Sequence, residues 1–567
     1  MIYNFLVFIF YYLLILISIL GYGLFFLKIL KIKINSNNFG YTGLFGIYIL
    51  LVYSYLSNLI IAHNEIHNIL IHFIGIILFI FSIKKNYLKY KKEIIFTFIV
   101  FLLIFCSLLQ FKNHDDFPYY HFPYTYYLTQ QSLYIGIGQF NLGFRTPSSI
   151  FYLNSLFYLP FAKFYLFNFS SIFILGFVNI ALLKKVHHYF KFYEFKNKKI
   201  NFINFLSLLS FIFINIFFYR LSEYGTDRAA MILIFLLIII LLDVVHIKKI
   251  KNTDLFYIYL LGALIISLKA FYILYLVLII PLFIFILKNE KYYIKSFRFL
   301  FFNKYCVIFF ILLFFVLGTY FINTGCLLYP ISFTCFDSMS WSIPLEEIHR
   351  LNNWYELWSK GGAAPNFRID NPGEYIKGFN WVNNWFNIYF FNKVSDYILG
   401  LTTLIIIVLF FFRKYFFNKN YNQINKHIYL VYFAICVLGI EWFYNHPALR
   451  YGGYHILALL LFIPISIKLG SSNIPLQKYT NITVILIIIA ISIFISRNIN
   501  RIQKEVKNYN YKPIQKTFYL IDDHYFRIQK KMDKLILQDR ECKNSTYVCN
   551  ISPKIKKLYG KIIFINP

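Results

Sequence analysis

Long apolar stretches recur along the whole chain and are separated by short polar gaps. A run of about 20 apolar residues is long enough to cross the hydrocarbon core of a bilayer as a helix. The pattern therefore predicts an all-α polytopic transmembrane helix bundle of about 12–14 helices with two long external loops. The predicted spans are residues 3–27, 40–61, 68–83, 94–110, 170–183, 201–218, 228–247, 255–268, 270–287, 305–322, 396–412, 428–444, 453–467 and 480–496.

A further apolar stretch, residues 149–167, is interrupted by Pro160 and Lys163. We expect it to form an interfacial helix that lies along the membrane. The first apolar segment is long and lacks a basic region before it, so we expect a retained helix and not a cleaved signal.

Basic residues gather in alternate gaps, for example KILKIKI, KKNYLKYKK and RKYFFNKNYNQINK. Because Lys and Arg stay on the cytoplasmic side, we expect these gaps to be cytoplasmic and the N-terminus, the long loops and the tail to be external. The chain then divides into five regions. They are N-terminal helices (1–93), a core (94–322) with an acidic loop (111–148), a Trp-rich loop (323–395), C-terminal helices (396–496) and a tail (497–567).

Composition agrees with a membrane protein. The 567 residues are 59% hydrophobic and only 14% charged, with a mean hydropathy of +0.60, whereas soluble domains carry about 25% charged residues. This excludes a soluble enzyme, a disordered chain and a disulfide-dense secreted module. The net charge of +32 reflects topology and a chain-wide bias toward Lys, so we expect the bilayer and not nucleic acid as a partner.

Cysteines provide a second indication of topology. Cys326 and Cys335 lie close together in the second loop, and Cys542 and Cys549 lie close together in the tail. Both segments are predicted to be external, where an oxidising compartment favours disulfides. We therefore expect two local disulfides.

The first long loop carries two adjacent carboxylates, Asp115 and Asp116, directly after a predicted helix. A carboxylate held at the membrane boundary can act as a general base for a hydroxyl group. With His114 or His121, the same pair can instead bind a divalent metal ion, which leaves the cofactor open. A solvated acidic turn is the structural alternative.

Few other polar positions are available to bind a substrate beside these carboxylates. They are Tyr119, Tyr120, Arg145, Arg228, Lys269 and Arg450. Arginine forks match phosphate oxygens bidentately, although ion pairs with Asp227 or Glu223 would equally account for two of the arginines. Lys269 falls between two helices with almost no loop, so it is held near the membrane interface or has a partner.

Five of the six tryptophans fall in the second loop. Trp381 and Trp385 are four residues apart and share one helix face. We expect an amphipathic helix that lies on the membrane, and stacking on a sugar ring is the alternative. The chain contains no P-loop, GxSxG, HExxH or CxxC motif.

An acidic pair at a helix exit that opens an external loop resembles the GT-C superfamily of membrane glycosyltransferases. The resemblance implies a sugar donor on a polyprenyl phosphate or diphosphate, Asp115 or Asp116 as the acidic motif, and an unknown glycan, lipid or protein acceptor. In that superfamily the motif usually follows the first helix, whereas here it follows the fourth. The chain also resembles uncharacterised bacterial membrane proteins with an HDD loop, a GC…P…TC loop and an ALRYG segment, which implies a bacterial inner membrane.

The expected function is sugar transfer at the external face. A transporter or flippase of lipid-linked glycans is one alternative, although such proteins place polar sites at the midplane, where this chain has almost no charge. A non-catalytic assembly protein is the other. The sequence predicts that the acids and the cations converge on one site at the outer rim.

Overall fold

The computed structural model describes residues 3–32, 38–84, 87–186, 200–223, 225–247, 250–290, 293–363, 368–416, 425–543, 552–558 and 560–566. Within these residues the α-helices are α1 (Tyr3–Ile29), α2 (Phe39–Asn58), α3 (Glu65–Lys84), α4 (Tyr87–Ile104), α5 (Phe122–Gln130), α6 (Ile137–Phe140), α7 (Ser149–Ser155), α8 (Phe169–Val186), α9 (Phe202–Phe217), α10 (Thr226–Ile247), α11 (Asn252–Leu268), α12 (Ile279–Glu290), α13 (Tyr293–Phe301), α14 (Cys306–Thr324), α15 (Leu345–Lys360), α16 (Pro372–Ile376), α17 (Val382–Trp385), α18 (Ser395–Phe416), α19 (His427–Asn445), α20 (Gly453–Gly470), α21 (Leu476–Tyr509) and α22 (Asp523–Lys543). The strands β1 (Lys554–Leu558) and β2 (Lys561–Ile565) pair antiparallel.

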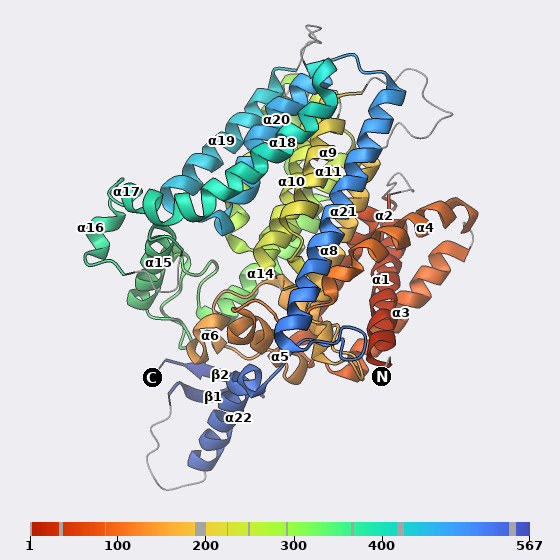
Figure 1. Ribbon diagram of the computed structural model, residues 1–567. Helices are drawn as coiled ribbons and strands as arrows, with labels where there is room; N and C mark the ends of the chain where they lie inside the picture. Colours follow the sequence, from red (N-terminus) through yellow and green to blue (C-terminus); the bar gives the residue numbers. More distant parts are fainter. Residues whose placement is uncertain are drawn as a thin grey trace.

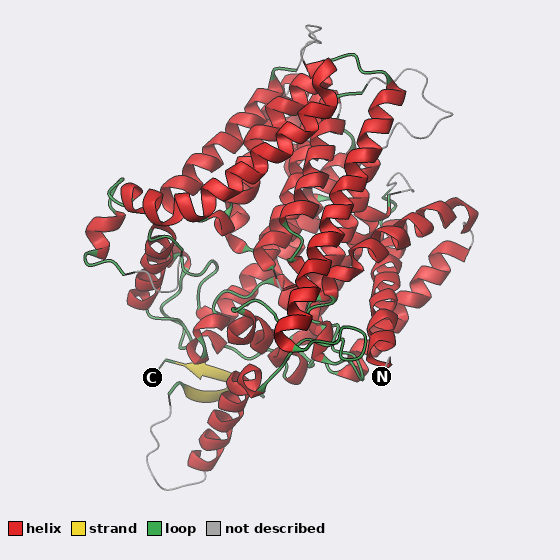
Figure 2. Cartoon of the chain, in the orientation of Figure 1, coloured by secondary structure: helices red, strands yellow, loops and turns green. Residues whose placement is uncertain are grey.

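The helices confirm the predicted fold class. Eleven helices of the described chain are long and apolar enough to cross a membrane, and α9 and α11 are shorter apolar helices. The chain is therefore an integral membrane protein. Figure 2 shows that its bundle consists of helices, with one small hairpin of two strands.

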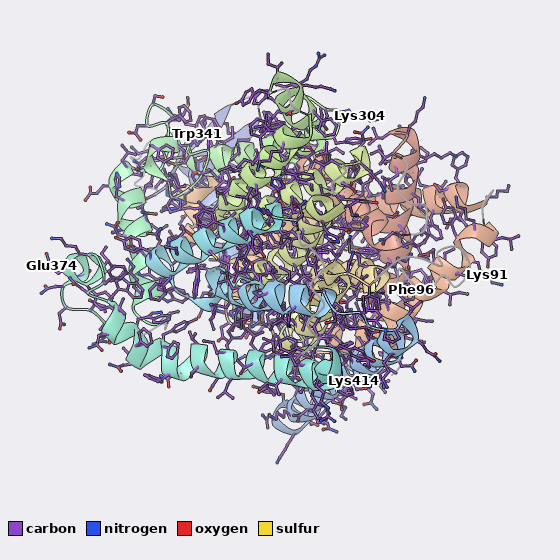
Figure 3. All side chains as sticks on the ribbon, turned by 90° about the horizontal axis from the view of Figure 1, so that it is seen from above. Lys91, Phe96, Lys304, Trp341, Glu374 and Lys414 are labelled. Atoms are coloured by element: carbon purple, nitrogen blue, oxygen red, sulfur yellow. A yellow bond between two sulfur atoms is a disulfide. The ribbon has the colours of Figure 1, made fainter. Side chains whose placement is uncertain are left out.

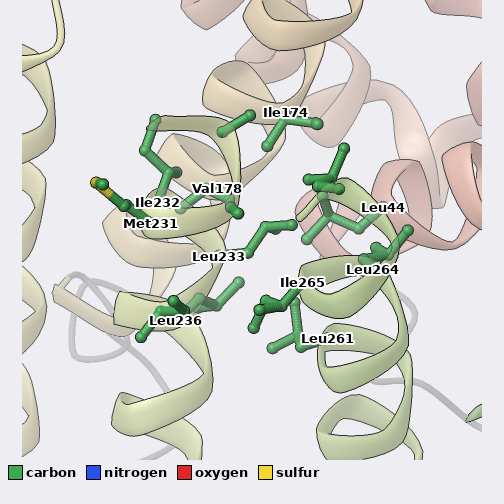
Figure 4. Packing of buried hydrophobic residues seen from close by; sticks show 14 of the residues in the cluster. Leu44, Ile174, Val178, Met231, Ile232, Leu233, Leu236, Leu261, Leu264 and Ile265 are labelled. Carbon is green, nitrogen blue, oxygen red and sulfur yellow. The ribbon is translucent and has the colours of Figure 1, made fainter. Parts of the chain in front are cut away.

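Helix α10 forms the centre of the bundle. It is apolar almost all round and nearly every residue is buried, because α8, α9, α11 and α20 surround it. Figure 4 shows how Leu233 and Leu236 of α10 pack against Leu261 and Ile265 of α11. Viewed from above, side chains fill the spaces between the helices, and Lys91 and Lys304 lie near the outline (Figure 3).

One end of the bundle carries most of the non-spanning structure, and both termini lie there (Figure 1). We call it the loop end; it contains α5, α6 and the β1–β2 hairpin. Helices α18 and α19 meet at the opposite end (Figure 1), where α18 finishes with Arg413 and Lys414.

The first long loop is folded and not extended. It contains α5, α6 and a short π-helix, η2 (Phe117–His121), and most of its aromatic side chains are buried. The predicted interfacial helix at 149–167 is wrong: α7 has seven residues and every one is buried. Its apolar residues pack on α2, α5 and α8, so protein and not lipid covers them.

The second long loop also differs from the prediction. Trp381 and Trp385 are buried, and both rings pack against Phe443 of α19 at 5.3 and 5.6 Å between centroids. The membrane-surface helix predicted from these two residues is therefore wrong. Helical structure begins at Val382 and continues through a π-helical segment, η8 (Phe386–Val394), into α18 as one apolar stretch.

The tail packs onto the loop end. Helix α21 extends to Tyr509, well beyond the predicted end at 496. The amide of Leu520 donates to the carbonyl of Phe111 at 2.8 Å, and Ile135 exchanges two backbone hydrogen bonds with Ile562 and Phe564 of β2. Tail and first loop therefore lie at the same end of the bundle, as the topology requires.

Glycine is needed where β2 approaches the first loop. Gly136 has φ +68°, and a Cβ there would lie 2.2 Å from the carbonyl oxygen of Phe564. Only glycine adopts this backbone and admits the strand without strain.

Candidate functional site

Four charged side chains from distant parts of the chain meet at the loop end. Arg450 donates from Nε to Oδ2 of Asp227 at 3.3 Å and lies 3.5 Å from Oδ2 of Asp116 through its terminal nitrogen. Lys269 Nζ lies 2.9 Å from Oδ1 of Asp227. We call these four residues the Arg450 cluster.

Local backbone structure presents each of the four side chains. Asp116 precedes η2, whose first turn contains Pro118, and its carboxylate makes no capping hydrogen bond. It is therefore available to Arg450. Asp227 lies in the first turn of α10 and Lys269 directly follows α11, positions where helix dipoles stabilise an anion and a cation respectively.

Arg450 lies in a 3₁₀ turn, η9 (Leu449–Tyr451), before α20. The turn ends at Gly452, which has φ +144°, a value that side-chain-bearing residues rarely adopt. Glycine thus allows the chain to enter α20 while Arg450 faces the two carboxylates.

Exposure differs among the members of the cluster. The side chain of Asp227 is 11% exposed, whereas those of Asp116, Lys269 and Arg450 are 32–37% exposed. Burial by itself lowers the pKa of Arg450, but Asp227, followed by Tyr451, Tyr120 and Asp116, outweighs it and the pKa is raised. Asp227 is thus the buried anchor, and the other three side chains remain open to solvent.

Two neighbours refine the environment of Asp116. The hydroxyl of Tyr120 donates to Oδ2 of Asp116 at 3.4 Å, and burial, followed by the charge of Asp116, raises the pKa of Tyr120 well above its usual value. Tyr120 therefore remains a neutral hydrogen-bond donor. His114 accepts the amide hydrogen of Asp116 on Nδ1 at 3.2 Å, and the same atom lies 3.6 Å from the carboxylate.

An aromatic surface lines the cluster. The guanidinium of Arg450 lies 5.7 Å from the ring of Trp358 and 5.9 Å from that of Tyr451, and Lys269 lies 5.9 Å from Tyr451. Trp358 belongs to α15, so both long loops contribute to the site. Cations over aromatic faces are held by the ring quadrupole, and a flat aromatic surface also suits a sugar ring.

The remaining first-loop residues divide into two groups. His121 is buried and lies close enough for the charges of Asp227 and Lys269 to act on it, while burial lowers its pKa well below the usual value. Asp115 points away: its side chain is 85% exposed and pairs with Lys112 at 3.5 Å. Tyr119 is also exposed and stacks under Arg527 of the tail.

Two predicted arginines lie outside the cluster. Arg145 is buried and pairs with Glu347 at 3.0 Å while donating to the hydroxyl of Tyr329. Arg228 lies next to Asp227 in sequence, but its guanidinium lies over Phe218 at 5.9 Å. Arg450 alone among these arginines thus contacts Asp116 in the part of the chain that the structure describes.

A second charged group lies nearby, and its central pair is buried. Glu223 accepts from Arg220 and lies 3.5 Å from Arg501 of α21, and the side chains of Glu223 and Arg501 are each 8% exposed. Arg501 also donates to the carbonyls of Ser107 and Leu109. This Glu223 network fastens α21 to the exit of α4.

Metal ligands do not accumulate at the cluster. Across the described ranges, no group of three or more His, Cys, Asp or Glu side chains is placed to hold a metal ion. The pair of His114 and Asp116 supplies two such groups and no third.

The disulfide prediction is confirmed for one pair. Cys326 and Cys335 are bonded. Cys542 is also disulfide-bonded, whereas its expected partner, Cys549, lies outside the described residues.

The fold and the cluster define a class: a polytopic integral membrane protein with a charged, aromatic-lined site at one end of its helix bundle. The DUF8201 family, described as a domain of unknown function, matches residues 5–457. The chain therefore belongs to this family, and the matched segment contains all four members of the Arg450 cluster. No curated protein matches the chain.

Sequence reasoning did not select Asp227 as a site residue. From the sequence, Asp227 is expected only as a possible partner of an arginine. It directly precedes the apolar run 228–247, and an acidic residue is common in the first turn of a helix. One feature of the sequence does indicate a role for Asp227. It is a carboxylate at the end of a nearly uncharged membrane span, where a charged side chain needs a partner.

Proposed function

We propose that this protein transfers a sugar from a polyprenyl-phosphate or polyprenyl-diphosphate donor to an acceptor hydroxyl at the outer face of a bacterial inner membrane. The observation that carries the proposal is the convergence of Asp116, Arg450 and Lys269 around Asp227. The carboxylate of Asp116 lies next to Arg450, and Lys269 pairs with the same Asp227. This arrangement matches the two needs of the reaction, a base for the acceptor and positive charge for the leaving phosphate.

The step is a single displacement. The acceptor oxygen attacks the anomeric carbon, the bond from that carbon to the phosphate oxygen breaks, and the bonding electrons leave with the phosphate. The acceptor proton passes to Asp116, and the configuration at carbon inverts. A positioned base contributes about 10²–10⁴-fold in rate.

Arg450 and Lys269 supply charge where it develops. Preorganised cations at the leaving oxygen stabilise the transition state without reorganisation. Asp227 positions them, because its two oxygens hold one cation each. Trp358 and Tyr451 give the sugar an apolar surface to lie on.

The orientation of the site supports an external reaction. The basic ends of α8 and α18, with Lys184, Lys185, Arg413 and Lys414, fit the cytoplasmic side under the positive-inside rule. The Cys326–Cys335 disulfide belongs to the second loop, which also provides Trp358, and disulfides persist in oxidising compartments.

The test compares two adjacent carboxylates in the same loop. Asp116→Asn and Asp115→Asn remove the same charge, one from the cluster and one from the surface. The full chain in nanodiscs is given polyprenyl phosphates and diphosphates that carry hexoses or pentoses, with membrane extract as the acceptor source. Release of the polyprenyl phosphate is followed by mass spectrometry.

We expect Asp116→Asn to lower the release rate by about 10²–10⁴-fold and Asp115→Asn to leave it nearly unchanged. Equal rates for Asp116→Asn and the wild type would contradict the proposal, as would a wild type that releases no carrier from any donor. A donor that reaches the other leaflet intact would favour the transporter alternative.

A further inference from the structure

A short disulfide-closed loop presents apolar side chains at the end of a membrane span. Residues 325–336, GCLLYPISFTCF, follow α14 directly and contain no charged residue. Cys326 and Cys335 close the loop, and the Thr334 hydroxyl donates to the carbonyls of Leu328 and Ile331. The loop is therefore held in one shape.

The side chains on the outside of this loop are unusual for a surface exposed to water. Phe333 at its tip is 88% exposed, and Leu327, Ile331 and Phe336 are also exposed. Exposed apolar groups gathered in one patch indicate an interaction surface.

The patch continues the lipid-facing stripe of α14. Val307, Phe310 and Phe314 of α14 are exposed and recur at helical spacing on a candidate membrane span, so they face lipid. Two turns beyond Phe314, the ring of Phe321 contacts Phe336 of the loop at 5.6 Å. The apolar surface thus passes from the span to the loop without a charged interruption, since Lys304 and Asp337 are the nearest charges in sequence.

A tryptophan that follows the loop and packs against α14 is of a residue type typical of the membrane interface. Trp341 packs on Phe321 at 5.8 Å, and its indole nitrogen donates to the Phe321 carbonyl at 3.1 Å. Tryptophan favours the headgroup level, where one part of its ring is dry and the other polar. That region adds about 5–8 Å on each side of the hydrocarbon core, a depth that a short hairpin at the end of a span occupies.

We infer that the Cys326–Cys335 loop inserts Phe333 and its neighbours into the headgroup–acyl boundary of the outer leaflet. The loop thereby fixes the depth of the bundle and of α15, which follows it in the chain. This inference does not depend on the proposed sugar transfer.

The test measures the environment of single positions in the full chain. Para-trifluoromethyl-phenylalanine is placed at position 333, and in separate preparations at 314 and 537, in nanodiscs of phosphatidylethanolamine and phosphatidylglycerol. Fluorine relaxation is measured with dissolved oxygen, which concentrates in lipid, and with a gadolinium chelate, which stays in water. Phe314 of α14 is the lipid control, and Leu537 of α22, which is 52% exposed, is the water control.

We expect oxygen to relax position 333 several-fold more than the chelate does, as at position 314, and the reverse at position 537. Strong relaxation of position 333 by the chelate would overturn the inference. Protection of position 333 from both agents in native membranes would also overturn it, because a protein partner and not lipid would then cover the loop.

Discussion

Two charged groups lie near the start of α10, and they differ chiefly in their access to solvent. In the Glu223 network the pair of Glu223 and Arg501 is buried, with each side chain 8% exposed, whereas Arg220 at the edge is 49% exposed. In the Arg450 cluster only Asp227 is comparably buried, and the side chains of Asp116, Lys269 and Arg450 are about one-third exposed. Glu223 and Asp227 are only four residues apart in the sequence.

The difference assigns the two groups separate roles. An ion pair between two buried side chains is closed to a ligand that arrives from solvent. Arg501 pairs with Glu223 and donates from one terminal nitrogen to the carbonyls of Ser107 and Leu109, so this network joins helices. The open cluster keeps part of each cation accessible, which is what a ligand requires.

The largest expected effect comes from breaking the buried pair of Glu223 and Arg501. Glu223→Gln removes one of the two carboxylates that act on Arg501, the other being Glu505, and breaking a buried ion pair costs about 3–5 kcal/mol of unfolding free energy. Denaturant unfolding of the protein in detergent micelles measures it. The matched control is Glu346→Gln on the exposed face of α15, and equal unfolding curves for the two variants would refute a structural role for Glu223.

The next effect concerns the open cluster. Arg450→Lys keeps the positive charge but replaces the planar guanidinium with a single ammonium group. The lysine can therefore no longer contact Asp116 and Asp227 together. A hydrogen bond to a charged group is worth about 1.5–3 kcal/mol. Because the lysine would lose one such bond to the leaving phosphate, we expect donor kcat/KM to fall roughly 10–100-fold. Arg228→Lys is the control, because Arg228 lies outside the cluster. A similar fall in kcat/KM for this variant would contradict the separate roles of Arg228 and Arg450.

A smaller, pH-dependent effect is expected at the edge of the open cluster. Burial lowers the pKa of His446, which packs against Tyr451, to about 4, compared with about 6.5 in an unfolded chain. Between these values the unfolded state binds more protons, so the contribution of His446 to stability falls as pH drops from 6.5 toward 4. Unfolding midpoints across that range should fall less in His446→Gln than in the wild type, and parallel curves would contradict the assignment.

The smallest effect is expected at the surface. Asp115→Asn removes an exposed pair with Lys112, which is worth less than about 1 kcal/mol. The unfolding midpoint of this variant should match that of the wild type. A clear loss of stability would mean that Asp115 belongs with its buried neighbours after all.

Much of the architecture was accessible from the sequence, because hydrophobic runs and basic gaps report directly on a bilayer. The fold class and the Cys326–Cys335 disulfide are confirmed, and the acidic loop and the tail share one end of the bundle. The interfacial interpretations of residues 149–167 and of Trp381 and Trp385 were wrong. An apolar helix face has the same pattern whether lipid or another helix covers it.

Periodicity and charge sign alone determined that this chain is a membrane bundle and which few polar residues stand near its loop end. Only the tertiary structure separated Asp116 from Asp115, brought Asp227 to the centre of the cluster and placed Arg145 and Arg228 elsewhere. The physical reason is that adjacent residues in a turn point in different directions. Ion pairs between residues more than 100 positions apart depend on how helices pack, which no local pattern encodes.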